Sequence, residues 1–169
     1  MTMDIDSLRN NLSNPARTYM WEVLIPQMPG GGSSEDLELR GASASIPGRS
    51  VGAISIPFKG TAGMKVPGKN KMDQTWKVTF REATDSKVFD ALNAWQEYIL
   101  SAKTGTGSLD PAVKTTLYLN LLNLEGETWS QIKLHGCYVE AIDAVDLSYE
   151  DEGVVVFGCT FSYDRWEKV

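Results

Sequence analysis

The residues best suited to covalent or acid–base chemistry in this chain are one histidine and two cysteines, His135, Cys137 and Cys159. An imidazole could act as a general base and a thiol as a nucleophile, provided that a third group orients them. No spacing in the sequence supports such a triad. Because His135 stands next to Gly136 at the end of an expected strand, we expect it to have a structural role.

Two cysteines can supply neither the four ligands of a usual structural zinc site nor a framework of several disulfides. Cys137 and Cys159 both fall on expected strands. One interpretation is that they are buried thiols that pack as small apolar side chains. The other interpretation is a disulfide, either within one subunit or between subunits.

Paired carboxylates are the remaining candidates for acid–base chemistry or for calcium binding. They occur at Asp143 and Asp146 and in the run from Glu150 to Glu152. These positions correspond to a strand end and a turn, where carboxylates are usually solvated. We therefore expect no catalytic residue, no bound metal and no cofactor.

A glycine-containing run from Gly63 to Lys69 matches the G-x-x-x-x-G-K spacing of phosphate-binding loops. The next residue is Asn70, so the hydroxyl group that would bind magnesium is missing. Pro67 removes one of the backbone N–H groups that would hold the phosphate, and no helix is expected to follow. We interpret the run as an ordinary loop that contains glycines.

The length and composition of the chain indicate one globular domain spanning residues 1–169, which is long enough to bury a core. The net charge of −6 favours solubility and disfavours a surface that grips phosphate groups. No apolar run approaches the ~20 residues that span a bilayer. The N-terminus also lacks the features of a secretory signal. We therefore expect synthesis in the cytoplasm and no membrane partner.

Most of the elements that would position these residues are strands. The clearest is expected at residues 154–166, where every second side chain from Val155 to Tyr163 is apolar or aromatic. The intervening side chains are small or apolar until Asp164, so we expect another subunit to cover the second face. Further strands are expected at 19–25, 37–40 (with Leu37 and Leu39 facing inward), 75–81, 117–121, 129–134, 138–142 and 145–149.

One helix is expected over residues 85–100, after a polar N-terminal segment with a helical turn around Ile5 and Leu8. Its apolar residues recur at the spacing of one helical face. We expect Phe89, Leu92 and Trp95 to pack into the core, with Trp95 at the centre. Either Asp85 or Ser86 could cap the N-terminus of this helix.

Residues 45–73 form a segment rich in proline and glycine, with two short runs that could be strands of a projecting hairpin. Loops of this length inside a domain usually have a function. A solvated, mobile loop is one interpretation, and an arm that contacts neighbouring subunits is the other. The residues expected to make these contacts are Ile54, Ile56, Phe58, Lys59, Met64, Lys65 and Val66.

Taken together, the pattern predicts a mainly β protein: a two-sheet antiparallel barrel or sandwich with one flanking helix and a long extended arm. Five segments then resemble, in order and spacing, the tail tube proteins of contractile bacteriophages and, more distantly, the tube proteins of contractile injection systems. They are residues 14–23, 39–47, 76–80 with the helix that follows, 134–139 and 157–166.

The resemblance implies a non-enzymatic structural subunit of the virion tail, assembled in the host cytoplasm. It implies rings of six subunits whose strands join into one inner barrel, stacked into a tube through which double-stranded DNA is ejected. It also implies contact with the tail sheath protein, the baseplate and the tail terminator. The tape-measure protein and DNA would pass through the lumen without specific binding.

The acidic balance of the chain suits a lumen that must not bind DNA. Candidates for a carboxylate lining are Asp143, Asp146, Glu150 and Glu152, although a merely solvated acidic surface would explain the same charges. Two other functions are open: a carbohydrate- or protein-binding β-sandwich module of a viral fibre, and an enzyme. Rings or hollow tubes in electron micrographs would favour the tube, and dispersed monomers that bind glycans would favour the fibre module.

Overall fold

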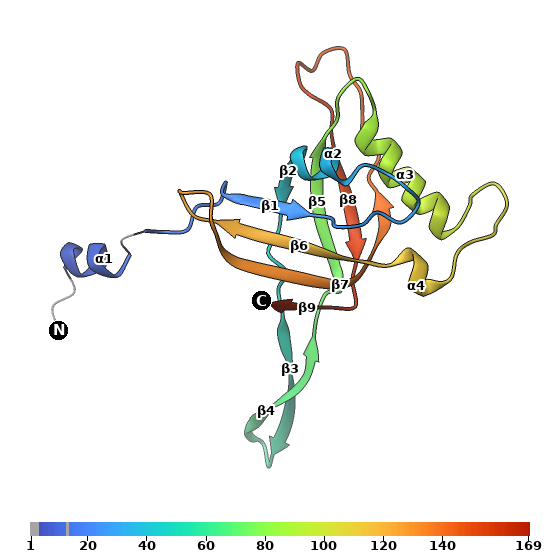
Figure 1. The fold of residues 1–169 in the computed structure, drawn as a ribbon. Coiled ribbons are helices and arrows are strands. Elements are labelled where there is room, and N and C mark those ends of the chain that lie inside the picture. The colour runs from blue at the N-terminus through green and yellow to red at the C-terminus, as the bar shows by residue number, and fades with distance from the viewer. Residues whose placement is uncertain (1–3, 13) are drawn as a thin grey trace.

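The computed structural model describes residues 4–12 and 14–169 (Figure 1). Its strands are β1 (Trp21–Leu24), β2 (Gly41–Ala44), β3 (Ser50–Phe58), β4 (Thr61–Lys71), β5 (Thr75–Arg81), β6 (Thr115–Leu122), β7 (Thr128–Ile142), β8 (Val156–Ser162) and β9 (Arg165–Lys168). Its helices are α1 (Ile5–Asn11), α2 (Ser34–Leu39), α3 (Lys87–Ile99) and α4 (Asp110–Val113).

Seven strands form one antiparallel sheet in the order β1-β6-β7-β8-β5-β2, with β9 paired to β7. The long strand β7 joins two halves of this sheet, because its first part pairs with β6 and β9 and its second part pairs with β8. In Figure 1, β1, β6 and the first part of β7 run across the direction of β2, β5 and β8. The other two strands, β3 and β4, form a separate hairpin that leaves the body.

The bend in β7 lies at Gly136, whose φ of +67° is a conformation that residues with a side chain rarely adopt. A Cβ atom at this position would collide with the carboxylate of Asp164. The backbone N–H of Asp164 donates to the carbonyl of His135 at 2.9 Å, which ties the turn between β8 and β9 to the bend. The sheet can therefore fold back and enclose a core between its two halves.

The core confirms the predicted antiparallel, mainly β fold. Alternate residues of β5 and β8 face inward, as their period-2 patterns predict, and the largest fully buried side chains include Trp76, Phe80, Trp95, Phe161 and Tyr163. The sheet is not a closed barrel: in the part of the chain that is described, the edge strands β1 and β2 do not pair with each other. The Trp21 ring lies against Gly41 at the gap between them.

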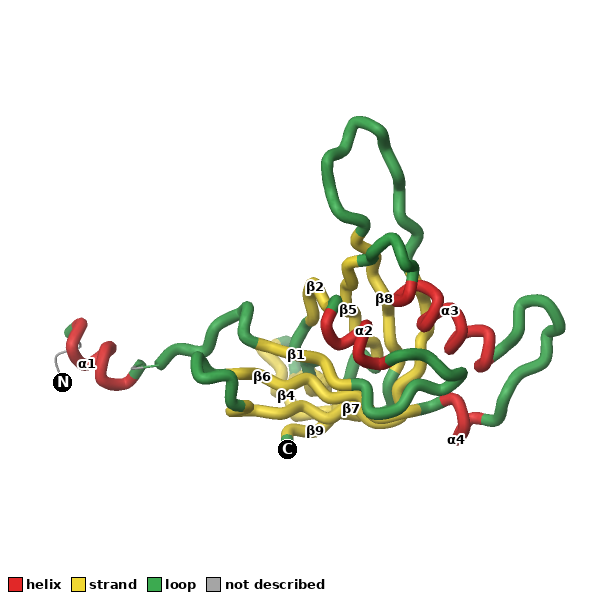
Figure 2. Tube along the Cα trace, turned by 45° about the horizontal axis from the view of Figure 1, so that its top comes forward, coloured by secondary structure: helices red, strands yellow, loops and turns green. Residues whose placement is uncertain are grey.

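Helix α3 lies against the bent sheet, beside β8 (Figure 2), and its buried residues belong to the core. Val88, Leu92 and Trp95 are fully buried, as their spacing along one face predicts. Of the two expected caps, Ser86 makes no capping bond through its side chain, whereas Asp85 accepts a long hydrogen bond from the backbone N–H of Lys87 at 3.4 Å. Glu82 also accepts a hydrogen bond from the backbone N–H of Phe89 at 2.7 Å. Among the described residues, no helix combines the length and apolar character of a membrane span.

Two strand predictions are wrong. Residues 34–39 form helix α2 instead of the start of a strand, so Leu37 is fully buried while Leu39, two residues on, is 77% exposed. Residues 143–155, expected to hold a strand at 145–149, form a long loop between β7 and β8. The final strand is also shorter than expected, because the chain turns at Tyr163 and Asp164 and continues as β9.

An ion cluster around Arg40 holds α2 against the start of α3. The Arg40 guanidinium contacts Asp85 at 2.7 Å, Asp36 at 3.3 Å and Glu82 at 3.3 Å. The hydrogen bond from Arg40 holds the pKa of Asp85 well below its usual range. Since a bidentate guanidinium–carboxylate pair fixes orientation, the cluster fixes the loop that leads from β5 into α3.

Candidate assembly interface

The β3–β4 hairpin, which we call the arm (Ser50–Lys71), is built by a tight turn and antiparallel pairing whose register shifts between Val51 and Ala53 and between Ile56 and Phe58. Lys59 and Gly60 occupy the turn with φ values of +35° and +74°. Both residues of a two-residue hairpin turn of this kind need positive φ, which Gly60 adopts without strain. Cα pairing runs from Ser50 opposite Lys71 to Phe58 opposite Thr61. The sequence prediction of a long projecting hairpin therefore agrees with the structure.

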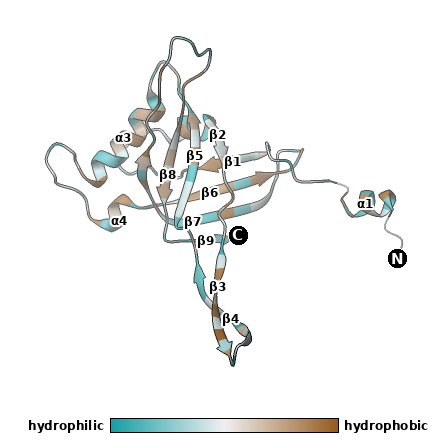
Figure 3. Ribbon diagram, turned by 180° about the vertical axis from the view of Figure 1, so that it is seen from behind, coloured by the Kyte–Doolittle hydropathy of each residue, from teal (hydrophilic) through white to brown (hydrophobic). Residues whose placement is uncertain are grey.

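The register brings the apolar arm residues onto one face. Ile54 is paired with Val66 and Ile56 with Met64, and Phe58 follows two residues on, beyond a shift in the register, opposite Thr61. Most of these side chains are exposed: Phe58 to 62%, Met64 to 61%, Ile54 to 55% and Ile56 to 42%. The two lysines of the predicted contact set, Lys59 and Lys65, are exposed at the turn and along β4. Figure 3 shows the apolar stretches of this hairpin, away from the body.

Tryptophans hold the base of the arm against the body. The indole N–H of Trp76 donates to the carbonyl of Ser45 at 2.6 Å. The indole N–H of Trp166 donates to the carbonyl of Gly48 at 3.3 Å, and the Arg49 guanidinium lies 6.0 Å from the centre of the same ring. The arm is therefore fixed where it leaves the body and uncovered along its length. An isolated two-stranded hairpin is marginally stable in water, so the anchoring at its base contributes to holding the arm in this form.

A second exposed segment, the loop of residues 143–155, lies at the opposite end of the body from the arm (Figure 1). It carries five carboxylates and no basic side chain. It also exposes large apolar side chains, among them Leu147 at 81% and Val154 at 67%. Of the carboxylates proposed for a lumen, Asp143 forms an ion pair with Lys77 at 2.6 Å. Asp146, Glu150 and Glu152 are exposed on the loop, and their lumen role stays a prediction.

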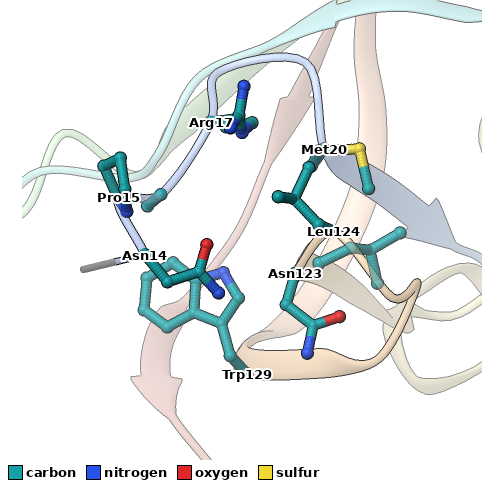
Figure 4. Close-up of a pocket in the computed structure, with 9 residues that line it drawn as sticks. Asn14, Pro15, Arg17, Met20, Asn123, Leu124 and Trp129 are labelled. Carbon is teal, nitrogen blue, oxygen red and sulfur yellow. The ribbon is translucent and has the colours of Figure 1, made fainter.

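A third apolar surface was not found from the sequence. Asn14 to Arg17 and Met20 lie opposite Trp129 and the turn between β6 and β7, around a cavity of about 350 Å³ (Figure 4). Trp129 is 51% exposed, and the Lys168 ammonium lies 5.8 Å from the centre of its ring. The residues described around this cavity contain no carboxylate, histidine or cysteine. Its lining is suited to apolar contact.

The histidine and the two cysteines, which were the candidates for covalent or acid–base chemistry, are hydrogen-bonded or buried. The Nε2 atom of His135 lies 2.6 Å from a carboxylate oxygen of Glu167, and this hydrogen bond lowers the pKa of Glu167. Cys137 and Cys159 are buried free thiols, as the first of the two interpretations states. Burial raises the pKa of Cys137 to about 12, so its thiolate is not available as a nucleophile near neutral pH.

Three further sequence interpretations can be compared with the structure. The interpretation of Gly63 to Lys69 as a loop is wrong, because these residues lie within strand β4 and pair with β3; the run therefore has neither the loop nor the following helix of a phosphate site. In the described part of the chain, no group of three or more histidine, cysteine or acidic side chains is arranged to hold a metal ion. Of the three helix residues expected in the core, Leu92 and Trp95 are buried, but Phe89 is 46% exposed at its margin, against Phe157.

Solved structures with the same fold come from contractile injection systems. One is a chain of the PVC sheath–tube complex in the extended state, with a TM-score of 0.63 and 16% identity, covering 99% of each chain. Another is from the PVC sheath/tube terminator, with a TM-score of 0.67 and 15% identity, covering 94% of this chain and 99% of that one. A third, from the 6-fold symmetrised baseplate of the anti-feeding prophage, has a TM-score of 0.65 and 10% identity, covering 94% and 97%.

No curated protein matches the chain in sequence. The family model described as phage tail tube protein matches residues 12–169, which is nearly the whole chain and includes every strand of the sheet, the arm and the acidic loop. The agreement between this match and the shared fold confirms the resemblance recognised in the sequence. The chain belongs to the phage tail tube protein family.

Proposed function

We propose that this chain is the repeating subunit of a tail tube, in which rings of six copies stack into a conduit for double-stranded DNA. The observation that carries the proposal is the arm. Its apolar face is exposed although it is regular in structure and tied to the body by Trp76 and Trp166. A surface of this kind marks a protein–protein contact, and in a family of tube proteins the simplest partner is another copy.

The remaining roles follow from the same proposal. The subunit has no catalytic activity, because the histidine is engaged by Glu167 and the two thiols are buried. Solved structures with this fold occur in a sheath–tube complex, a sheath/tube terminator and a baseplate. By analogy, the tube contacts a sheath, a baseplate and a terminator, and it lies in the tail of the virion after assembly in the host cytoplasm.

Electron microscopy of the purified protein tests the proposal directly. We expect negatively stained samples to contain rings or hollow tubes, and size-exclusion chromatography to show species far larger than one subunit. Dispersed monomers over a wide range of protein concentration and salt would contradict self-assembly. If such monomers bound a glycan array, the second function, a carbohydrate-binding module, would replace the tube.

A further prediction concerns DNA. Five basic residues of this acidic chain lie between Ser45 and Asp73, which leaves the rest of the subunit more acidic than the whole. DNA affinity grows with each phosphate that a cation neutralises. We therefore expect assembled tubes not to retain double-stranded DNA in a gel-shift assay, even at low ionic strength, where attraction is strongest. Retention of DNA by intact tubes would show that the lumen or the outer wall is a binding surface.

A further inference from the structure

The arm and the 143–155 loop are complementary in charge. The segment that contains the arm carries Arg49 and four lysines against a single carboxylate, Asp73. The loop carries five carboxylates and no cation. Coulomb attraction between such surfaces steers association and sets orientation. Within one subunit the two cannot meet, because they extend from opposite ends of the body (Figure 1).

The same two surfaces also match in polarity. At the base of the loop, Val145, Leu147 and Val155 face Phe89 and Phe157 across a cavity of about 380 Å³. Glu82 and Asp143 also line it, but Arg40 and Lys77 of the same subunit already pair with these carboxylates, so the acidic groups open to a partner are those of the loop itself. The arm presents a ring and two flexible or branched apolar side chains, Phe58, Met64 and Ile56, with Lys59 directly beyond Phe58. An apolar pocket beside an acidic loop is therefore complementary to apolar side chains flanked by lysines.

The apolar cavity at Trp129 is a poorer match for the arm. The charged side chain among the residues that line it is Arg17. A guanidinium there would oppose the approach of Lys59 and Lys65, since like charges brought together at an interface are destabilising. Charge therefore distinguishes the two cavities as acceptors for the arm.

We propose that the arm of one copy docks on the 143–155 loop of a second copy, with Phe58 in the cavity between that loop and α3 and with Lys59 and Lys65 facing the loop carboxylates. The proposal rests on the proposed function, because it identifies the surface through which one ring contacts the next. Donor and acceptor lie at opposite ends of each copy, so the contact is head-to-tail and leaves a free arm at one end of a stack and a free loop at the other. A contact that does not close on itself generates a filament.

This assignment gives the acidic residues of the loop a partner in place of a lumen role. Asp146 and Glu150 would be neutralised by arm lysines in a tube and exposed only on the terminal ring. It also explains how a subunit with a concentrated basic segment can form a tube without DNA-binding cations, because stacking covers them.

Charge reversal tests the pairing. The arm variant carries Lys59→Glu and Lys65→Glu, and the loop variant carries Asp146→Lys and Glu150→Lys. Each variant alone is expected to stop at single rings in electron micrographs, because like charges then meet at the contact. The subunit that carries all four changes is expected to form tubes again. Circular dichroism and thermal unfolding check that each variant folds; all four positions are exposed, so we expect the body to be unaffected.

Mixing the two single variants gives a sharper result. The loop variant keeps a normal arm and the arm variant keeps a normal loop, so one normal contact can form between them. At the other contact, the acidic arm of the arm variant meets the basic loop of the loop variant, which is the same reversed pairing as in the four-fold variant. A mixture is therefore expected to grow into tubes, although neither variant alone grows beyond single rings.

The outcomes separate this inference from the function on which it rests. If the unaltered protein forms no rings or tubes, the proposed function is wrong. If the unaltered protein forms tubes but neither the four-fold variant nor the mixture of the two single variants recovers them, the arm binds another surface. In that case the tube proposal stands and the assigned acceptor is overturned.

Discussion

Shortening the arm is expected to abolish tube formation and to leave a folded subunit. The variant removes residues 51–70 and joins Ser50 to Lys71 through two glycines. These two residues are directly paired in the hairpin, so a two-residue turn can span them without moving the strands. The removed residues contribute no side chain to the buried core. Thermal unfolding tests whether the shortened subunit is folded, and electron microscopy tests whether it forms tubes.

The matched control keeps the hairpin and changes only its apolar face, with Ile56→Ser and Phe58→Ser. Both side chains are exposed in the subunit, at 42% and 62%, so their loss should have little effect on the unfolding temperature. It should nevertheless prevent stacking, because the apolar area that the partner would cover is gone. Normal tubes from either variant would show that the arm is a solvated loop, which is the other interpretation of its sequence.

The arm could be predicted from the sequence because its signals are local. Alternation of Ile54, Ile56 and Phe58 defines a strand face, and Lys59-Gly60 supplies a turn. The buried faces of β5 and β8 were predictable for the same reason. Along α3, the helical period placed Leu92 and Trp95 correctly. It failed only for Phe89, where the margin of the core depends on how the neighbouring loop lies.

The wrong predictions come from segments where two patterns compete. Leu37 and Leu39 alternate as in a strand, but three acidic residues and Ser33 before and among them suit the first turns of a helix. The tertiary contact that decides is the Arg40 cluster, which the sequence does not reveal because Asp36 and Asp85 are far apart in the chain. Residues 145–149 alternate as well. They remain a loop in the subunit because no strand lies beside them to pair with.

The sequence predicted the arm as a contact surface but did not predict the apolar surface of the 143–155 loop. The local sequence around an exposed apolar residue does not distinguish it from an apolar residue of the core. Leu147 therefore looked like part of a strand, and its 81% exposure is a property of the fold. The basic residues of the arm and the acidic residues of the loop can be read from the sequence. That they could pair between two copies follows only from the positions of the arm and the loop at opposite ends of the body.

Trp95→Ala is expected to produce the largest loss of stability of any single change in α3, about 3–5 kcal/mol in the free energy of unfolding. The side chain is fully buried and lies 6.0 Å, centre to centre, from the ring of Phe161. Its indole N–H donates to the carbonyl of Val113 at 2.9 Å, so the change also leaves a buried acceptor without its partner. Denaturant unfolding should be measured in the arm-shortened subunit, where assembly cannot add to the apparent stability.

Two control variants separate the contribution of the indole hydrogen bond from that of the buried aromatic area. Trp95→Phe keeps an aromatic ring near Phe161 but removes the indole N–H, so it should lose less than the alanine variant. Tyr98→Ala changes an aromatic residue on the same helix that is 40% exposed, and it should cost clearly less than Trp95→Ala because less apolar area leaves the core. If Trp95→Ala and Tyr98→Ala unfold at nearly the same denaturant concentration, α3 does not pack on β8 through Trp95. The helix would then present that residue outward, where a surrounding sheath could contact it.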